Sequence, residues 1–355
     1  MIHPLDVHDI ARKFPIVKKL PNSLVESSFR LFPPVHASHI TGVRSGYAEV
    51  EGDFVSCTLT TRQMTTLPEK YVLKKIIETG KLAERLGAKI VGLGATTSVV
   101  GDAGLTVAKN LNIAVTTGNS YTVYTALEGT RKAAEMMGVE LAKSEVVVIG
   151  ATGSIGGICA RIMARESRYI TLVARNEARM ENLARQILLE SGLAVTITTD
   201  VKKALSRADI VITVTSSADT VIEPEYLKPG TIVSDVARPR DVSKKVAEER
   251  DDILVIEGGL VEVPGDVNFN FNFGYPPKVA LACMSETMIL ALEGRFENYT
   301  IGRELTLEQV EEIGRLAKKH GFKLAGFRSF ERPVEQKTIE RIKQRAIVKR
   351  NSLRA

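Results

Sequence analysis

Cysteine is scarce in this sequence, and the spacing of the three cysteines limits what they can do. Cys57, Cys159 and Cys283 lie far apart, and none belongs to a CxxC motif. Three widely spaced cysteines suggest neither a disulfide framework nor a zinc site. We therefore expect no metal centre, and at least one thiol is free for chemistry.

Long apolar runs, internal repeats and low-complexity tracts are also absent. No run approaches the ~20 apolar residues that cross a bilayer. Asp6, His8 and Asp9 interrupt the N-terminal stretch where a signal peptide needs apolar residues. We expect a cytoplasmic protein without a transmembrane segment. The 355 residues, 44% hydrophobic and 25% charged, are typical of two or three globular domains.

Excess charge is missing from most of the chain. Residues 328–355 carry nine Lys or Arg and three Glu, which accounts for the whole net charge of +6 and leaves 39 basic and 39 acidic residues elsewhere. We interpret this basic tail as a solvated helix or frayed end and expect no specific nucleic-acid binding. A docking surface for an acidic partner is the alternative.

No histidine is spaced to pair with a catalytic carboxylate, so the cysteines are the candidate nucleophiles. Cys57, in VSCTLTTR, is followed by polar residues and Arg62, which would support a thiolate. Cys159 is expected to pack in a helix. Cys283 lies in VALACMSETMILALEG, whose composition alone is typical of an inert buried thiol.

The first third of the chain has the rhythm of an α/β unit. Alternation over 47–60 predicts strands, and helical periodicity predicts a helix over 70–86 that ends before Gly87. A short apolar strand over 89–93, a helix over 104–111 and a strand over 113–116 follow. A helix over 121–137 then connects this region to the next.

The middle of the chain alternates Val/Ile-rich strands with helices. The expected strands are 145–149, 169–174, 194–199, 210–214, 231–235 and 254–256, and the expected helices are 155–165, 177–190 and 201–207. Continuous apolar strands bounded by Gly or Asp are typical of a parallel sheet covered on both faces. We predict a doubly wound Rossmann domain over residues 119–259.

The end of the chain is expected to return to the first domain. Residues 261–277 are irregular, an apolar helix spans 278–292, and a more polar helix spans 307–320. The predicted organisation is an N-terminal α/β domain (1–118), the Rossmann domain (119–259), a returning helical segment (260–327) and the basic tail (328–355). The apolar helix needs a large face to cover it, so we expect these helices to complete the first domain.

The strand-turn-helix sequence VVVIGATGSIG predicts a nucleotide site. Gly150, Gly153 and Gly156 follow the strand with GxxGxxG spacing, which permits a tight turn and close approach of the backbone to a pyrophosphate at the helix N-terminus. Thr152, Ser154 and Ile155 complete this turn and are expected to line the cofactor. The pair Gly92 and Gly94 lacks a third glycine, and we interpret it as a tight turn rather than a second nucleotide site.

The end of the second strand predicts which nicotinamide cofactor binds. Arg175 and Asn176 stand about 20 residues after the last glycine, where an NAD site would place an acidic residue. A guanidinium there can bind a 2′-phosphate, so we expect NADPH. Thr215 and Ser216 close another strand at the same edge and are further candidates for the cofactor site.

Several blocks of the sequence resemble the long-chain acyl-[acyl-carrier-protein] reductases known from cyanobacteria. The similarity is collinear over residues 32–325 and includes AKIVGLGATTSVVGDAG, VVVIGATGSIGGICARIMA, LVARNEARMENLARQI and VALACMSETMILALEGRFENYTIGR. The resemblance implies NADPH-dependent reduction of a fatty acyl thioester to a fatty aldehyde. It also implies that Cys283, which matches the nucleophile of that family, carries the acyl group. The donor would be acyl carrier protein or coenzyme A, and an aldehyde-consuming enzyme would act downstream.

Three alternatives stay open at this point. The domain layout is also similar to shikimate dehydrogenases, although no N-x-T-x-P-x-K segment supplies their lysine, and to glutamyl-tRNA reductases, for which Cys57 would be the nucleophile. A non-catalytic NADP-binding regulator is the third. The expected helix start at residue 278 puts Cys283 beyond the first turn, so we do not expect the helix to lower its pKa.

Overall fold

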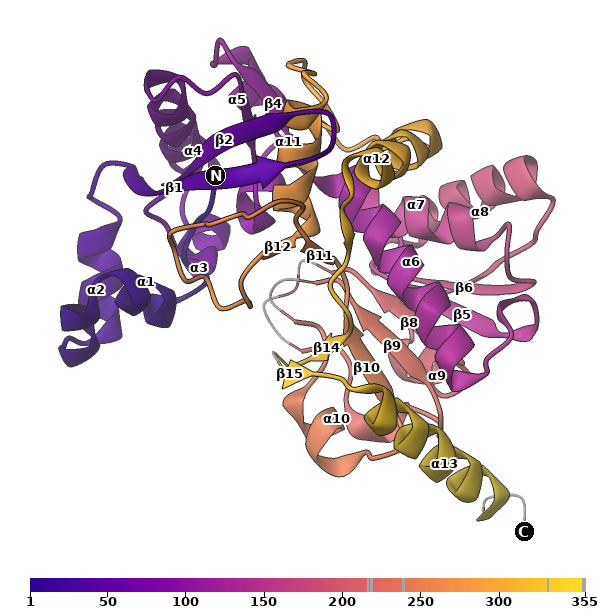
Figure 1. The fold of residues 1–355 in the computed structure, drawn as a ribbon. Coiled ribbons are helices and arrows are strands. Elements are labelled where there is room, and N and C mark those ends of the chain that lie inside the picture. Colours follow the sequence, from indigo (N-terminus) through magenta and orange to yellow (C-terminus); the bar gives the residue numbers. More distant parts are fainter. Residues whose placement is uncertain (216, 218–219, 238–239, 331, 353–355) are drawn as a thin grey trace. The chain divides into compact units, whose positions relative to one another are not determined.

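A computed structural model describes residues 1–215, 217, 220–237, 240–330 and 332–352. The chain forms two compact units (Figure 1). Unit 1 comprises Met1–Tyr121, Val261–Glu304 and Glu308–Lys323, and unit 2 comprises Thr122–Leu260, Leu305–Leu307 and Leu324–Ala355. The C-terminal helices thus complete the N-terminal unit, whereas the basic tail lies in unit 2.

Unit 2 contains a six-stranded, wholly parallel sheet. Its strands are β5 (Glu145–Ile149), β6 (Tyr169–Val173), β7 (Thr196–Thr198), β8 (Ile210–Thr213), β9 (Ile232–Asp235) and β10 (Leu254–Glu257). The strand order is β10-β9-β8-β5-β6-β7. In a Rossmann sheet the chain runs outward from the first strand in one direction and then returns to continue in the other, and this order has that form. The predicted fold class is confirmed, and the order reverses between β5 and β8.

The helices of unit 2 are α6 (Asn119–Met137), which begins in unit 1, α7 (Ser154–Met163), α8 (Glu177–Ser191), α9 (Val201–Leu205), α10 (Lys244–Glu249) and α13 (Gln336–Ser352). Four of them, α7 to α10, each follow a strand of the sheet, while α6 precedes the sheet and α13 comes near the end of the chain. The 3-10 helices η3 (Leu141–Lys143) and η4 (Pro224–Tyr226) and the short strands β14 (Arg328–Ser329) and β15 (Arg332–Pro333) complete the unit.

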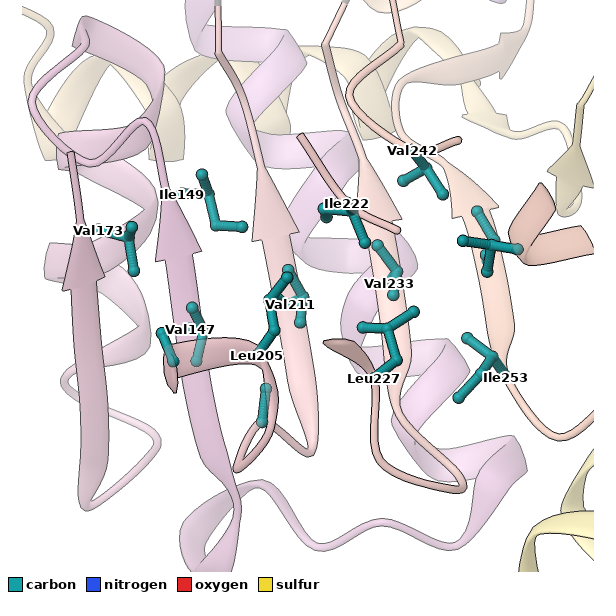
Figure 2. Close-up of a cluster of buried hydrophobic side chains, with 14 residues drawn as sticks. Val147, Ile149, Val173, Leu205, Val211, Ile222, Leu227, Val233, Val242 and Ile253 are labelled. Carbon is teal, nitrogen blue, oxygen red and sulfur yellow. The ribbon is translucent and has the colours of Figure 1, made fainter. Parts of the chain in front are cut away.

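One face of the parallel sheet packs on a core that Figure 2 shows in detail. Val147 and Ile149 of β5 point into this core together with Val211 and Val233, and Leu205 of α9 covers them. Alternate residues of a strand point to opposite faces, so Val146 and Val148, which are also buried, point to the other face of the sheet. This explains why both phases of each strand are apolar.

Unit 1 combines a hairpin, a small parallel pair and several helices. The antiparallel strands are β1 (Val35–Arg44) and β2 (Glu49–Ser56), and the parallel strands are β3 (Ile90–Gly92) and β4 (Ala114–Thr116). Helices α3 (Thr61–Thr66), α4 (Glu69–Arg85) and α5 (Leu105–Lys109) pack with them, and the turn after β3 forms η2 (Ala95–Ser98). Their buried core includes Val55, Leu59, Val72, Ile76 and Leu93.

The C-terminal part of unit 1 differs from the sequence prediction at one important point. The apolar segment does not form one helix over 278–292 but a strand, β12 (Val279–Leu281), followed by helix α11 (Ala282–Leu292). Lys278 has a φ of 65° and Leu281 is extended, so the helix cannot begin before Ala282. Strands β11 (Leu260–Glu262), β12 and β13 (Lys323–Leu324) form a small sheet, and α12 (Leu307–His320) has the predicted bounds.

The N-terminal residues form a helical lobe that the sequence did not predict. It consists of α1 (Val7–Lys13), η1 (Pro15–Lys19) and α2 (Asn22–Phe29), with its own small core of Val7, Ile10 and Val25. Helix α13 near the other end of the chain also makes specific contacts. In α13, Lys349 contacts the carboxylates of Asp251 and Asp252 at 2.8 Å each, so this part of the basic tail is a docked helix rather than a frayed end.

Candidate functional site

The glycine turn after β5 lies at the point where the sheet order reverses, and its glycines are required by close contacts. Gly150 has a φ of +81°, and a Cβ there would lie 2.9 Å from the carbonyl oxygen of Val214. A Cβ on Gly156 would lie 2.3 Å from the carbonyl oxygen of Gly150. The first turn of α7 therefore packs directly on the turn, which larger residues would prevent.

The N-terminus of α7 offers unpartnered backbone donors. Gly153 precedes the helix and provides no side-chain cap, while its own N–H donates to Gly150 at 2.9 Å. The first N–H groups of a helix have no partner within the helix, and together with the helix dipole they favour an anion. Thr152, Ser154 and Ile155 surround this end, and Nη2 of Arg179 donates to the carbonyl oxygen of Thr152 at 3.1 Å.

The two residues after β6 have different surroundings. Arg175 is exposed, and its guanidinium is available to an anion. Asn176 is the N-cap of α8, and its side-chain oxygen accepts a hydrogen bond from the Arg179 N–H at 3.0 Å. The local helix thus already uses the oxygen of Asn176, so any contact with a cofactor would come from its amide N–H₂.

The loop after β8 is held by a buried carboxylate that the sequence did not single out. Asp241 accepts hydrogen bonds from the hydroxyls of Thr213 and Thr215 and from the Thr215 N–H at 2.9 Å. The hydroxyl of Thr215 therefore already donates to Asp241, and the part of Thr215 in the cofactor site stays a prediction. Ser216, the other candidate here, lies outside the described residues.

The structure places Cys283 in the first turn of a helix, contrary to the expectation from sequence. It is the second residue of α11, whose first turn contains no acidic residue. Burial raises the pKa of the Cys283 thiol, and the nearby backbone amides of Ala95 and Met284 offset part of that increase. The turn that presents Ala95 follows β3, at the glycine pair noted in the sequence.

A fully buried carboxylate, Glu286, lies one helical turn after Cys283. Its two oxygens accept hydrogen bonds from five donors on three segments of unit 1, namely the hydroxyls of Thr116, Ser120 and Thr300 and the N–H groups of Gly118 and Tyr121. These contacts fasten α11 to the turn between β4 and α6. They satisfy a charge that would otherwise be costly to bury.

Two glycines let neighbouring backbone approach α11. Gly118 has a φ of +76°, and a Cβ there would lie 2.3 Å from the Cα of Cys283. A Cβ on Gly92 would lie 2.0 Å from Oγ1 of Thr287. The position of Cys283 is thus fixed by close packing as well as by the hydrogen bonds of Glu286.

The other two cysteines have the properties of core residues. Cys57 and Cys159 are both fully buried. Burial raises the pKa of Cys57 to about 11 and that of Cys159 to about 12. A thiol of this kind stays protonated at neutral pH and out of reach of a substrate. Cys283 is partly exposed.

Two further observations concern metal binding and membrane-spanning helices. Among these residues, no three or more His, Cys, Asp or Glu side chains are grouped so that they could hold a metal ion. Within the same part of the chain, no helix combines the length and apolar character needed to cross a membrane.

The middle of the chain matches a known protein family. Residues 131–257 match the model of the shikimate / quinate 5-dehydrogenase family. This segment contains the glycine turn and all six strands of the parallel sheet.

Two curated proteins are similar over most of this chain. Aminotransferase PigE of Serratia sp. is 34% identical over 264 residues, which are 73% of this chain but only 30% of PigE. A long-chain acyl-[acyl-carrier-protein] reductase of Synechococcus elongatus is 28% identical over 305 residues, or 82% of this chain and 87% of the reductase. The chain therefore spans less than a third of PigE and nearly all of the reductase.

Two solved structures are similar to parts of this chain. One dipicolinate synthase chain of Bacillus halodurans has a TM-score of 0.33 at 17% identity, covering 54% of this chain and 62% of its own. The nucleotide-binding domain of glutamyl-tRNA reductase from Thermoplasma volcanium has a TM-score of 0.28 at 17% identity, covering 39% and 84%.

The strand order, the glycine turn and the family match together define a class: the chain carries an NAD(P)-binding Rossmann unit like that of NAD(P)-dependent oxidoreductases. Within this class it resembles the long-chain acyl-[acyl-carrier-protein] reductases, and that resemblance, predicted from the sequence, is confirmed. The expected cofactor, NADPH, agrees with the class. The roles of the individual site residues remain predictions.

Proposed function

We propose that this protein reduces a long-chain fatty acyl thioester to a fatty aldehyde with NADPH, through an acyl group carried on Cys283. One observation carries the proposal. Cys283 is a partly exposed thiol in the first turn of a helix, held in place by the close approach of Gly118 and the hydrogen bonds of Glu286. Helix N-termini and backbone donors are the surroundings in which a cysteine becomes a nucleophile.

The residues of unit 2 fit a dinucleotide. Gly150 and Gly156 keep the turn tight, because a Cβ on either would meet the backbone of Val214 or Gly150, and the uncapped N-terminus of α7 suits a pyrophosphate. Arg175 would bind the 2′-phosphate that distinguishes NADPH from NADH. When bound, NADPH would supply a hydride to the acyl carbon.

The chain's own contribution begins with the sulfur of Cys283. It attacks the thioester carbonyl, a new carbon–sulfur bond forms, and the bond to the carrier sulfur breaks. The carrier leaves as a free thiol with the proton that Cys283 loses. After the acyl carbon has been reduced, its bond to Cys283 breaks and free aldehyde leaves. The thiolate left on Cys283, which the nearby backbone amides of Ala95 and Met284 favour, then takes up a proton from solvent and the thiol is restored.

An apolar aromatic cluster favours a fatty acyl substrate. In the segment NFNFNFGY before β12, each Asn is exposed, whereas Phe269 is buried and Phe271 and Phe273 are half-buried. The Phe273 ring lies 5.4 Å from the ring of Phe54 and 5.2 Å from that of Phe269. This segment leads through β12 into α11, the helix that presents Cys283, so we propose that its ring surface contacts the acyl chain.

The test is aldehyde formation from a C16 acyl thioester, offered on acyl carrier protein and on coenzyme A with NADPH. We expect aldehyde from the wild type and from Cys57→Ser, and none from Cys283→Ser. Loss with Cys57→Ser alone would instead favour a nucleophile in the first part of the chain, as in the glutamyl-tRNA reductase alternative. Tight NADPH binding with no aldehyde from either donor would contradict the proposal and leave a reductase of another substrate or a cofactor-binding regulator.

A further inference from the structure

The N-terminal lobe exposes more large apolar side chains than its size explains. Within residues 14–32 these are Phe14, Ile16, Leu20, Leu24, Leu31 and Phe32, with Ile16 76% and Leu31 73% exposed. Single exposed apolar residues are ordinary on a protein surface, but six in one short stretch mark a contact surface.

The exposed apolar side chains are not core residues of a poorly packed lobe. The lobe has its own buried residues, Val7, Ile10 and Val25, and Phe29 packs partly against them. The centroid of the Phe29 ring also lies 6.3 Å from that of Phe14 and 6.2 Å from that of Phe32, so both exposed rings pack against Phe29. The outward apolar residues therefore remain on the surface after the lobe has folded.

The charge among these apolar residues is of one sign. Lys18, Lys19 and Arg30 have no ion-pair partner within the part of the chain that the structure describes. The only carboxylate in residues 14–32, Glu26, is buried and paired with Arg62. At the start of the lobe, the Asp6 carboxylate caps α1. Residues 14–32 thus present uncompensated cations between Leu, Ile and Phe side chains.

We propose that this lobe, residues 14–32 with α1 beneath them, binds the surface of an anionic phospholipid bilayer. Aliphatic and aromatic side chains enter the interfacial region while interspersed lysines and arginine meet lipid phosphates. The apolar side chains and the unpaired cations lie interspersed in one short helical stretch, which is the pattern of segments that bind in a bilayer interface; capture of an acidic protein instead is an outcome of the test below. The inference rests on this surface alone and does not depend on the reaction proposed above.

The experiment is co-sedimentation of the full chain with vesicles of phosphatidylcholine alone or mixed with phosphatidylglycerol. We expect binding to the anionic vesicles that weakens as salt is raised. Lys18→Gln with Lys19→Gln should weaken it by roughly fivefold per charge removed. Ile16→Ser with Leu31→Ser should weaken it at least about tenfold, because apolar insertion is lost.

Matched controls lie outside the lobe, and circular dichroism verifies that each variant folds. Leu189→Ser removes an apolar residue that is 81% exposed on α8, and Lys81→Gln removes an exposed charge on α4; both should bind like wild type. The inference is overturned if the two lobe variants keep wild-type binding, which would move the contact elsewhere, for example to α13. It is equally overturned if the protein ignores anionic vesicles while the lobe captures an acidic carrier protein.

Discussion

The carboxylate of Glu286 is predicted to hold Cys283 in place, and Glu286→Gln tests this. The change keeps the shape of the side chain but removes its charge and turns one acceptor oxygen into an N–H₂ donor. That donor must face either the pair Ser120 and Tyr121 or the donors on the other oxygen, so at least one hydrogen bond to a charged acceptor is lost. Such bonds contribute about 1.5 to 3 kcal/mol each.

Since the site is fully buried and several donors are affected, we expect Glu286→Gln to lower the free energy of unfolding by about 2 to 4 kcal/mol in urea denaturation. Glu304→Gln, at an exposed carboxylate, should change it by less than about 0.5 kcal/mol. The Glu286 charge also raises the pKa of Cys283. The variant should therefore shift the pH dependence of Cys283 alkylation by iodoacetamide to lower pH.

The two readouts separate a positioning role from general stability. A stability loss equal to that of Glu304→Gln, with an unchanged alkylation profile, would refute the role assigned to Glu286. In the wild type, burial keeps the pKa of Cys283 above its ordinary value, so its alkylation rate should still be rising with pH above neutrality.

Three further predictions concern single residues of the two sites. Gly118→Ala places a Cβ 2.3 Å from the Cα of Cys283 at a positive φ, and should cost about 2 to 4 kcal/mol of stability and slow alkylation of Cys283. Gly156→Ala places a Cβ 2.3 Å from the oxygen of Gly150, and should weaken NADPH binding at least about tenfold by fluorescence titration. Arg175→Ala should weaken NADPH binding about ten- to a hundredfold and leave NADH binding unchanged.

Each of these variants has a control on the same unit. Gly87→Ala and Gly192→Ala also have positive φ but meet no atom within 4 Å, so they should cost about 1 kcal/mol and spare both sites. Arg179→Ala removes a guanidinium that contacts the Thr152 carbonyl, and should affect NADPH and NADH equally. Equal losses of both cofactors with Arg175→Ala would contradict its assignment to the 2′-phosphate.

The Rossmann sheet could be predicted because its local signals agree. In strand 145–149 the residues from Val146 to Ile149 are buried and apolar, and Gly150, Gly153 and Gly156 mark the turn that follows. The cofactor roles of Arg175 and Asn176 stay predictions. Sequence could not show that Asn176 is an N-cap or that Asp241 holds Thr215.

The surroundings of Cys283 could not be predicted, because they depend on contacts distant in the chain. The segment Val-Ala-Leu-Ala before it is apolar, and apolar residues at this density fit a strand or a helix equally well. The positive φ of Lys278 and the pairing of β12 decide in favour of the strand. Glu286 meets Thr116 and Ser120 across more than 160 residues of chain. The N-terminal lobe was missed because its helices are short and weakly periodic.

The central claim is that Cys283 carries the acyl group, and trapping that group tests it most directly. The protein is incubated with a C16 acyl thioester without NADPH, and its intact mass is measured before peptide mapping. The account predicts one added palmitoyl mass located on Cys283, lost when NADPH is added and absent from Cys283→Ser. Aldehyde formation with no acylated protein, or an acyl group mapped to another residue, would contradict it.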